Sequence, residues 1–415
     1  MFNRIAERVN AMAYSAQQVL EFVEQNDVKF IRLAFCDIRG IQKNISIMPG
    51  QLGAALTHGI SVRTADIAGY GAAGQQRMVL KPVPSTMSIL PWRPQQGRVL
   101  RLYCDLYNAD GTPYACDARA ALKTAVASLK QEGYQLTVGF AGDFYLFQTD
   151  DNGNPTLQPF DAGGYLDISP LDRGENVRRE ICLTMEQMGI SPASSQHEAG
   201  PGQHCMQTVA TDALAAADDC ITYRWVVKTV ASRNGLFASF LPQPIAFEPG
   251  SGLLFYLHLS QNDAAVEEQT LQRFANGIYA HLDEISAIAN PIGNSYQRLN
   301  KRVGKLALQI QTMPDGSKRL CVPFADGACN PYAVLCLLIG AGIEGLHAPA
   351  ELPQKDFPKD LSQAVEVLKQ STFVRQAICP FWVEQYLIRK QEEMVDMEKE
   401  VDFATGEFNP YFPLI

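Results

Sequence analysis

The stretch GYLDISPLDRGENVRREICLTMEQMGISPASSQHEAGPGQ, residues 164–203, decides how the rest of the chain is interpreted. Asp172 can cap a helix whose apolar residues recur at about 3.6-residue spacing, and Gly189 ends that helix. The segment that follows sets His197 and Glu198 in a short extended run that a Gly-Pro-Gly sequence closes. We expect this run to be a strand end that offers the Glu198 carboxylate to a cavity.

The order of these residues resembles the central catalytic segment of the glutamine synthetase family. The shared pattern is Y-x-x-x-x-P-x-D, then a helix ending ME-Q-M-G, then H-E-x-x-P-G-Q. Three further stretches carry the same resemblance: the hairpin VKFIRLAFCDIRGIQKNISI after a short helix at 16–25, the segment LKPVPSTM, and NPIGNSYQRL. The resemblance covers nearly the whole chain.

This resemblance implies an α+β fold of the glutamine synthetase type. It predicts a small N-terminal β-grasp domain over residues 16–108 and a large C-terminal catalytic-type domain over residues 113–415. The larger domain should be built on a curved, largely antiparallel sheet. The turn-rich sequence NADGTP, residues 108–113, is typical of a linker.

Composition limits the classes of partner. A chain of 415 residues exceeds the size of one hydrophobic core, which favours two domains. A formal charge of −9 gives no basic field for nucleic acid or anionic lipid, and the most apolar run, 331–346, is too short for a membrane span. The ten cysteines form no C-x-x-C pair, which indicates thiols in a reducing cytoplasm.

In the family reaction, ATP phosphorylates the γ-carboxylate of glutamate and ammonia then displaces phosphate. The resemblance implies two magnesium or manganese ions, held by carboxylates on the strands of the sheet. In the strand GFAGDFYLF, Ala141 and Asp143 stand where the family has two metal-binding glutamates. Glu198 matches a third, and Cys205 replaces a fourth. Asp143 and Glu198 are therefore the metal ligands that we expect to remain.

The nucleotide and substrate sides keep some of the family's residues. Gly250 matches the glutamate-binding glycine, and His258 and Ser260 align with the nucleotide side. Tyr256 falls where the family has a metal-binding histidine. Arg298, in NSYQRL, aligns with an arginine that holds substrate.

Other catalytic positions differ from the family. Arg63 stands where the family carries an aspartate in a loop that reaches the neighbouring subunit's site, and Lys301–Lys305 replaces its glutamate loop. Cys321 and Pro323 occupy the final metal ligand and arginine. We predict that Arg63 lies near the next subunit's pocket, where its charge pairs with the acids that remain.

These losses predict a degenerate active site that lacks glutamine synthesis and serves binding, scaffolding or regulation, because the reaction needs cations to offset phosphate charge. The alternative is an active ATP-dependent ligase that joins glutamate to ammonia or another amine with a reduced metal set. ATP and Mg²⁺ or Mn²⁺ would then bind weakly. A softer ion such as Zn²⁺ is a minority alternative, held by Cys205, Cys321, His204 and Asp143.

Each of these residues also has a structural interpretation. Asp143 could be a hydrogen-bonded core acid, and both cysteines could be small apolar fillers. Family resemblance further predicts a homo-oligomer of two stacked rings with each pocket between neighbouring subunits. Beyond copies of itself, the expected partners are a glutamate-like small molecule or a nucleotide.

Overall fold

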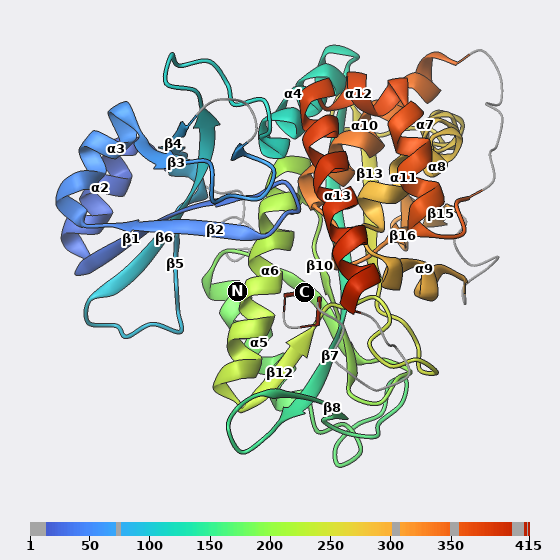
Figure 1. Ribbon diagram of the computed structural model, residues 1–415, viewed down its shortest axis with the longest axis horizontal. Coiled ribbons are helices and arrows are strands. Elements are labelled where there is room, and N and C mark those ends of the chain that lie inside the picture. The colour runs from blue at the N-terminus through green and yellow to red at the C-terminus, as the bar shows by residue number, and fades with distance from the viewer. Residues whose placement is uncertain (1–13, 72–75, 301–307, 349–356, 401–410, 413) are drawn as a thin grey trace.

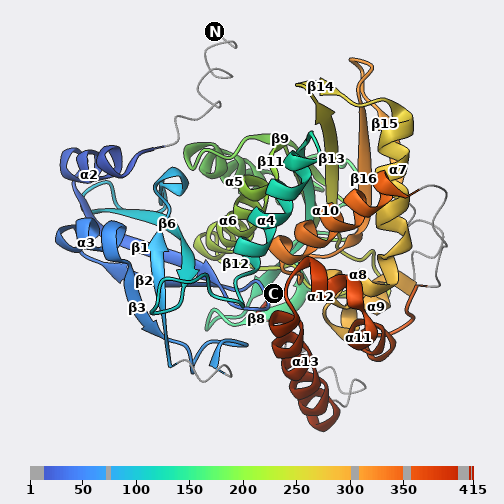
Figure 2. The ribbon, with the colours of Figure 1, turned by 90° about the horizontal axis from the view of Figure 1, so that it is seen from above.

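The structure is a computed structural model that describes residues 14–71, 76–300, 308–348, 357–400, 411–412 and 414–415. Its elements form two sheets with helices packed beside them, and the smaller sheet belongs to the N-terminal part of the chain (Figure 1; Figure 2). The sequence-based expectation of an α+β fold with a curved, largely antiparallel sheet in the larger domain is confirmed.

The smaller sheet has the strand order β2-β1-β6-β4-β3, and β5 pairs with β6. Its β1–β6 pair is parallel and its other pairs are antiparallel. The strands are β1 (Val28–Cys36), β2 (Gln42–Ile47), β3 (Ile60–Arg63), β4 (Arg77–Pro82), β5 (Ser88–Ile89) and β6 (Arg98–Tyr107). The helices α2 (Ala16–Gln25) and α3 (Leu52–His58) accompany it, with the 3-10 turns η1 (Pro49–Gln51) and η3 (Pro84–Thr86).

The larger sheet has the strand order β15-β16-β13-β7-β10-β9, with β8, β11 and β12 paired to β7 and β14 paired to β13. All of its pairs are antiparallel. The strands are β7 (Tyr134–Thr149), β8 (Pro155–Pro159), β9 (Pro192–His197), β10 (Gln203–Thr208), β11 (Thr211–Asp212), β12 (Leu236–Ser239), β13 (Leu253–Gln261), β14 (Ala264–Ala265), β15 (Gln309–Thr312) and β16 (Lys318–Ala325).

Helices cover one face of this sheet (Figure 2). The helices of this domain are α4 (Ala118–Gln131), α5 (Glu175–Gln187), α6 (Ala213–Arg233), α7 (Glu268–Ala280), α8 (Leu282–Ala289), α9 (Gly293–Asn300), α10 (Pro331–His347), α11 (Leu361–Gln370), α12 (Thr372–Ala377) and α13 (Pro380–Glu400). Helices α4, α5, α6 and α7 contact the strands, whereas α11, α12 and α13 pack on other helices. Helix α10 is buried on nearly every side, as its continuous apolar sequence predicts. Within the described residues, no helix is long and apolar enough to cross a membrane.

Side chains alternate along β7 between the two faces of the larger sheet, and the two faces have different surroundings. Phe140 and Phe144 point toward α6, where they pack against the Tyr223 ring. The Tyr223 hydroxyl donates to the carbonyl of Gly142 at 2.7 Å. Because strand side chains alternate with a period of two, Asp143 points to the other face. That second face, away from α6, is where the candidate site lies.

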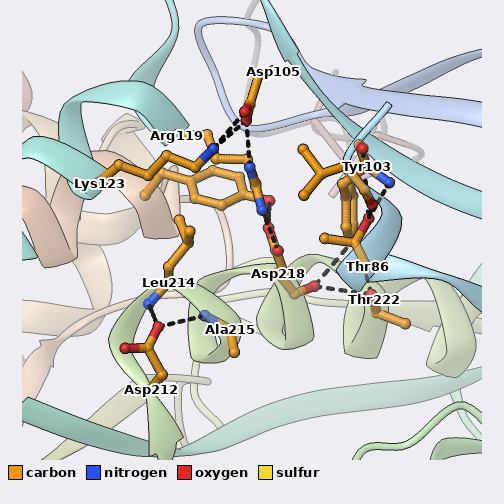
Figure 3. A network of polar contacts seen from close by, with 12 residues as sticks. Thr86, Tyr103, Asp105, Arg119, Lys123, Asp212, Leu214, Ala215, Asp218 and Thr222 are labelled. Carbon is orange, nitrogen blue, oxygen red and sulfur yellow. Dashed lines mark hydrogen bonds and ion pairs between the residues drawn. The ribbon is translucent and has the colours of Figure 1, made fainter. Parts of the chain in front are cut away.

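A buried polar network holds the smaller sheet against helices of the larger domain (Figure 3). The Arg119 guanidinium of α4 binds Asp105 of β6 at 2.6 Å and Asp218 of α6 at 2.8 Å. The Tyr103 hydroxyl of β6 lies 2.9 Å from the Thr222 hydroxyl of α6. Because these groups are almost fully buried and satisfy one another, they fix the docking geometry of the two domains.

Two details differ from the sequence-based expectation. Gly174, not Asp172, is the N-cap of α5, because both carboxylate oxygens of Asp172 bind the Arg178 guanidinium, at 3.0 and 2.6 Å. The region from Leu361 to Glu400 forms three helices, since Ser371 caps α12 and interrupts what the apolar pattern presents as one.

Candidate active site

Three side chains on the open face of the larger sheet form a compact donor cluster. Asp143 on β7 lies directly opposite Cys205 on β10, and Glu198 follows the last residue of β9. One donor atom from each residue lies within 4.8 Å of the other two. We name Asp143, Glu198 and Cys205 the acid–thiol cluster. Asp143 and Glu198, predicted from sequence as the remaining metal ligands, are therefore brought together, and their role as ligands stays a prediction.

Neighbouring groups orient both carboxylates of the acid–thiol cluster. An Asp143 oxygen accepts a hydrogen bond from the backbone N–H of Gly252 at 2.9 Å. The Gln196 amide donates to Glu198 at 2.9 Å. Burial, followed by the charge of Asp143, raises the pKa of the Cys205 thiol well above its ordinary value. In the chain alone, Cys205 therefore stays protonated at neutral pH.

The acid–thiol cluster fits one divalent ion better than two magnesium ions. Mg²⁺ requires near-octahedral oxygen ligation, and a thiol is a poor oxygen substitute. A borderline-soft ion accepts carboxylate and thiolate together, and it deprotonates a thiol on binding. The cluster supplies one set of such donors, with Ala141 offering none. These residues would hold a single softer divalent cation, and the two-magnesium arrangement implied by the resemblance does not fit them.

The same face continues across β13 and β16. Tyr256 lies opposite Cys321, and the Arg319 guanidinium lies over the Tyr256 ring, 3.9 Å from its centre. Burial, then the charge of Arg319, lowers the pKa of His258, so its imidazole is neutral at pH 7. Arg319 thus supplies a positive charge to this face that the sequence interpretation missed. The sequence could have revealed Arg319, because side-chain alternation in the strand KRLCVPF places Arg319, Cys321 and Pro323 on one side of the sheet.

Arg298 and Gly250, both predicted from the family motif, meet at the edge of this face. Arg298 on α9 is 1% exposed and donates to the Asn290 side chain at 2.9 Å and to the Phe324 carbonyl at 2.7 Å. A Cβ atom at position 250 would lie 2.6 Å from the Arg298 side chain, so only glycine permits this approach. The aliphatic part of the Arg298 side chain therefore packs against the loop that contains Gly250, while its guanidinium binds Asn290 and Phe324.

His258 and Ser260 lie farther along the sheet from the acid–thiol cluster. They oppose Thr137 and Gln135 on β7, so His258 is six residues along that strand from Asp143, or about 20 Å at strand spacing. The structure thus places the residues predicted for the nucleotide side at a distance from those predicted for metal. Whether they bind nucleotide stays a prediction.

Arg63 lies at the end of β3 with a side chain that is 75% exposed. It pairs with Asp66 in its own chain at 3.1 Å. The predicted pairing with acids of a neighbouring subunit stays a prediction, since it concerns another copy of the chain. The replacement at 301–305 falls outside the described residues.

The four-residue zinc set that the sequence suggested is not assembled as a unit. His204 precedes Cys205 on β10 and so points to the opposite face, where its ring packs against Phe144 and its Nδ1 lies 2.9 Å from the Arg178 guanidinium. Glu198 takes the place near Cys205 that we had assigned to His204. The error arose because adjacent strand residues cannot share a face.

Behind the sheet, Asp161, His197 and His204 form a second group of possible donors, which we name the buried histidine cluster. Asp161 accepts hydrogen bonds from His197 at 2.8 Å and from the backbone N–H of Gly202 at 2.8 Å. All of these side chains are buried. Burial lowers the pKa of His204 to about 3, with the charge of Arg178 as the next cause.

Comparison with known proteins identifies the family. The glutamine synthetase β-Grasp domain matches residues 27–109, and the glutamine synthetase catalytic domain matches residues 115–408. Glutamine synthetase of Clostridium saccharobutylicum is 34% identical, covering 94% of this chain and 97% of its own. Glutamine synthetase of Methanosarcina mazei is also 34% identical, covering 91% of this chain and 93% of its own.

Solved structures show the same fold. The Plasmodium falciparum glutamine synthetase structure has a TM-score of 0.84 at 18% identity and covers 96% of this chain and all of its own. A GmaS/ADP complex has a TM-score of 0.81 at 24% identity, with 92% and 96% coverage.

These relatives correct the functional prediction from sequence. The expectation of a degenerate active site is wrong, because relatives at 31–34% identity over almost the whole chain are named glutamine synthetase. They agree better with the alternative, an active ligase. The residue-by-residue comparison counted each lost ligand separately and missed the charge of Arg319 on the same face. Taken with the two matched domains, the full-length identity shows that this chain belongs to the glutamine synthetase family.

Proposed function

We propose that this protein is an ATP-dependent ligase that joins the γ-carboxylate of glutamate to ammonia or to another amine, using a reduced metal set. The observation that carries the proposal is full-length identity of 34% to enzymes named glutamine synthetase. The convergence of Asp143 and Glu198 with Cys205 on the open sheet face supports it.

In this proposal the acid–thiol cluster holds one divalent cation. A cation at that point would offset the charge of the transferring phosphoryl group. Arg319, held over Tyr256, adds a second positive charge to the same face. Preorganised charges of this kind stabilise the transition state without rearrangement during the reaction. The reduced metal set is thus partly compensated by an arginine of this chain.

Substrate and nucleotide take the two ends of this face. Gly250 leaves space for a carboxylate to approach the backbone, and Arg298 holds that loop from behind, which makes Arg298 a positioning residue. His258 and Ser260 lie toward the other end of the face and are proposed to contact ATP. The neutral His258 imidazole can donate or accept a hydrogen bond there without adding charge.

We further propose that the protein works as a ring-shaped homo-oligomer in the cytoplasm. The segment between β8 and α5 exposes large apolar side chains, namely Tyr165, Leu166, Ile168 and Leu171 at 58–79% exposure. A cluster of exposed apolar residues is typical of a protein interface. Contact with a neighbouring subunit would bury this segment, and in the ring the Arg63 loop would approach the next copy's site.

The test is ligase turnover by the purified full-length protein. ADP release and product formation are measured with glutamate, ATP and either ammonia, methylamine or hydroxylamine, in the presence of Mg²⁺, Mn²⁺ or Zn²⁺. We expect turnover that requires the carboxylate and the amine together, with Mn²⁺ or Zn²⁺ more effective than Mg²⁺. ATP hydrolysis that is indifferent to both substrates with every ion would contradict the proposal.

A matched pair of variants separates the acid–thiol cluster from general charge loss. Asp143→Asn removes one donor, whereas Asp212→Asn removes an exposed N-cap carboxylate of α6 at the same formal charge. Only Asp143→Asn should lower turnover strongly, by about 100-fold. Equal losses in both variants would place the chemistry elsewhere.

A further inference from the structure

A cavity of about 260 Å³ lies between the two domains, apart from the candidate active site. Its walls come from the β1–β2 hairpin, from α6, from α13 and from the last residues of the chain. Figure 1 shows α6 between the domains, with the C-terminal end of the chain beside it.

The larger sheet separates this cavity from the acid–thiol cluster. Helix α6 packs on the sheet face that carries Phe140 and Phe144, through Tyr223. Ile221, Arg224, Trp225 and Lys228, on the same helix, line the cavity. Asp143 and Glu198 do not line it. A molecule in this cavity therefore occupies a second site.

The cavity wall is strongly cationic. It carries Arg32, Arg39, Arg224, Lys228 and Lys390 against the single acidic side chain Glu393. Glu393 is already bound by Lys390 at 2.6 Å and lies 3.7 Å from Arg39. The excess positive charge consequently resides mainly on the α6 side of the cavity.

The cations on that side lack acidic partners. Within the described residues, no carboxylate forms an ion pair with Arg32, Arg224 or Lys228. Arg224 uses Nη1 to bind the carbonyls of Gly327 at 2.8 Å and Cys329 at 3.1 Å. Among the described residues, its buried Nη2 has no hydrogen-bond partner. A buried guanidinium N–H without a partner is costly, and it leaves the Arg224 charge uncompensated beside the cavity.

We propose that this cavity binds a small organic dianion, recognised through its carboxylate or phosphate groups by Arg224, Arg32 and Lys228. Guanidinium groups match the geometry of both oxyanions. Trp225, which the Arg32 guanidinium approaches at 5.7 Å from the ring centre, and Ile221 supply an apolar wall for the carbon skeleton. The volume suits a metabolite-sized molecule.

The state of Lys228 agrees with an anion site. Burial, then the charge of Arg224, lowers the pKa of Lys228 to about 8, and its ammonium donates only to the carbonyl of Leu414 at 2.9 Å among described residues. A bound anion would favour the charged ammonium and raise this pKa. Binding should therefore take up protons near pH 8.

The loop between β16 and α10 connects this cavity to the substrate side. Gly327 and Ala328 line the cavity, while Asp326, in the same loop, lies 3.9 Å from the Arg298 guanidinium. A ligand that changes how Arg224 holds Gly327 changes the support of Arg298 as well. We thus expect the dianion to regulate substrate affinity, a consequence that rests on the proposed ligase function, whereas binding itself does not.

Binding is tested by isothermal titration of the full-length protein with inorganic phosphate, pyrophosphate and succinate, in chloride buffer of constant ionic strength. We expect at least one of these anions to bind with a dissociation constant below about 1 mM and to raise the melting temperature by a few degrees. The phosphate and succinate arms distinguish a phosphate ester from a dicarboxylate. Absence of binding by all three at 10 mM overturns the proposal.

Two double variants of equal charge supply the control. Arg32→Gln with Lys228→Gln removes two cavity cations, and Lys81→Gln with Arg98→Gln removes two cations that do not line the cavity. The cavity variant should bind at least tenfold more weakly, and the control should bind as the unaltered chain does. Equal weakening would assign the binding to surface charge and overturn the proposal.

The binding test can be interpreted even if the protein shows no ligase activity, because titration and thermal melting require no turnover. If the protein is active, the bound anion should change the KM for glutamate more than kcat. Binding without any change in either constant would remove the regulatory part of the proposal and leave the site.

Discussion

The acid–thiol cluster and the buried histidine cluster lie back to back on the same strands, yet they are built for different purposes. Cys205 and His204 are neighbours on β10, and Glu198 follows His197 directly. Asp161 and His197 are buried and hydrogen-bonded to each other, and His204 is buried with its Nδ1 beside the Arg178 guanidinium, whereas Asp143 and Glu198 remain half-buried on the open face. The difference teaches that donor identity alone does not distinguish the two clusters, because burial and the surrounding partners differ between them.

The largest test of this contrast is removal of the Asp161 carboxylate. Asp161→Ala removes the hydrogen-bond acceptor of the backbone N–H groups of Gly202 and Arg173 and of the His197 ring. We expect a loss of about 4 kcal/mol in the free energy of unfolding, since several buried donors lose their acceptor together. Urea denaturation measures it. Asp143→Ala is the control, and its loss in the free energy of unfolding should be smaller by about 2 kcal/mol or more.

The second test concerns activity. Asp143→Asn keeps an oxygen for the Gly252 N–H but removes the negative charge of the acid–thiol cluster. We expect kcat/KM to fall about 100-fold, the usual effect of removing one preorganised charge, while the free energy of unfolding changes by less than about 1 kcal/mol. Steady-state ADP release is the measurement. A fully active Asp143→Asn would remove this cluster from the mechanism.

The third test uses pH. The pKa of His204 is lowered to about 3 by burial, so the unfolded chain binds more protons than the folded chain between pH 3 and the ordinary histidine pKa of about 6.5. Stability should therefore fall by several kcal/mol as the pH drops through that window. The lowered pKa of Asp161 adds a loss below about pH 4. The raised pKa of His197 acts above about pH 6.5, where stability rises as the pH falls, and its contribution is constant within the His204 window.

Variants isolate the contribution of His204. His204→Gln should flatten the dependence of unfolding free energy on pH between about 3 and 6.5, the folded and ordinary pKa values of this histidine. His258→Gln, on the half-buried open face, removes a smaller lowering of pKa and should flatten that slope less. An NMR titration that shows His204 gaining a proton at pH 6 would contradict the assignment.

The smallest expected effect is on metal affinity. Cys205→Ser removes the soft donor of the acid–thiol cluster and should weaken Zn²⁺ binding about tenfold with little effect on Mg²⁺. Isothermal titration with each ion measures this. His204→Gln is the control from the buried histidine cluster and should leave Zn²⁺ binding unchanged. If His204→Gln alone lowered zinc affinity, the roles of the two clusters would have to be exchanged.

The sequence predicted the fold well where local and periodic signals agree. The hairpin of β1 and β2 and the preceding helix α2 lie where the sequence predicted them. The two acids of the open face were found through a motif whose spacing puts strand residues on one side. Such signals are short in range, so a single sequence contains them.

What the sequence missed depends on contacts between distant segments. Asp161 sits in a loop with no periodicity, and its role follows only from its approach to His197, which is 36 residues away. The contribution of Arg319 to the open face follows only from the pairing of its strand with β13, which brings its guanidinium over the Tyr256 ring. The prediction of a degenerate site weighed each missing ligand alone and left out the positive charge that Arg319 brings to the same face.

The alternation along β10 also has an evolutionary meaning. A side chain at Gly174 would lie 2.4 Å from the His204 ring, so change at either position must be matched by the other. Cys205, one residue later, faces the open side, and a new donor there requires no second substitution in the packed core. Single substitutions at Cys205 can accordingly change metal preference while the packed face around His204 stays the same. Along this strand, a lineage can therefore change its chemistry one substitution at a time without loss of the fold.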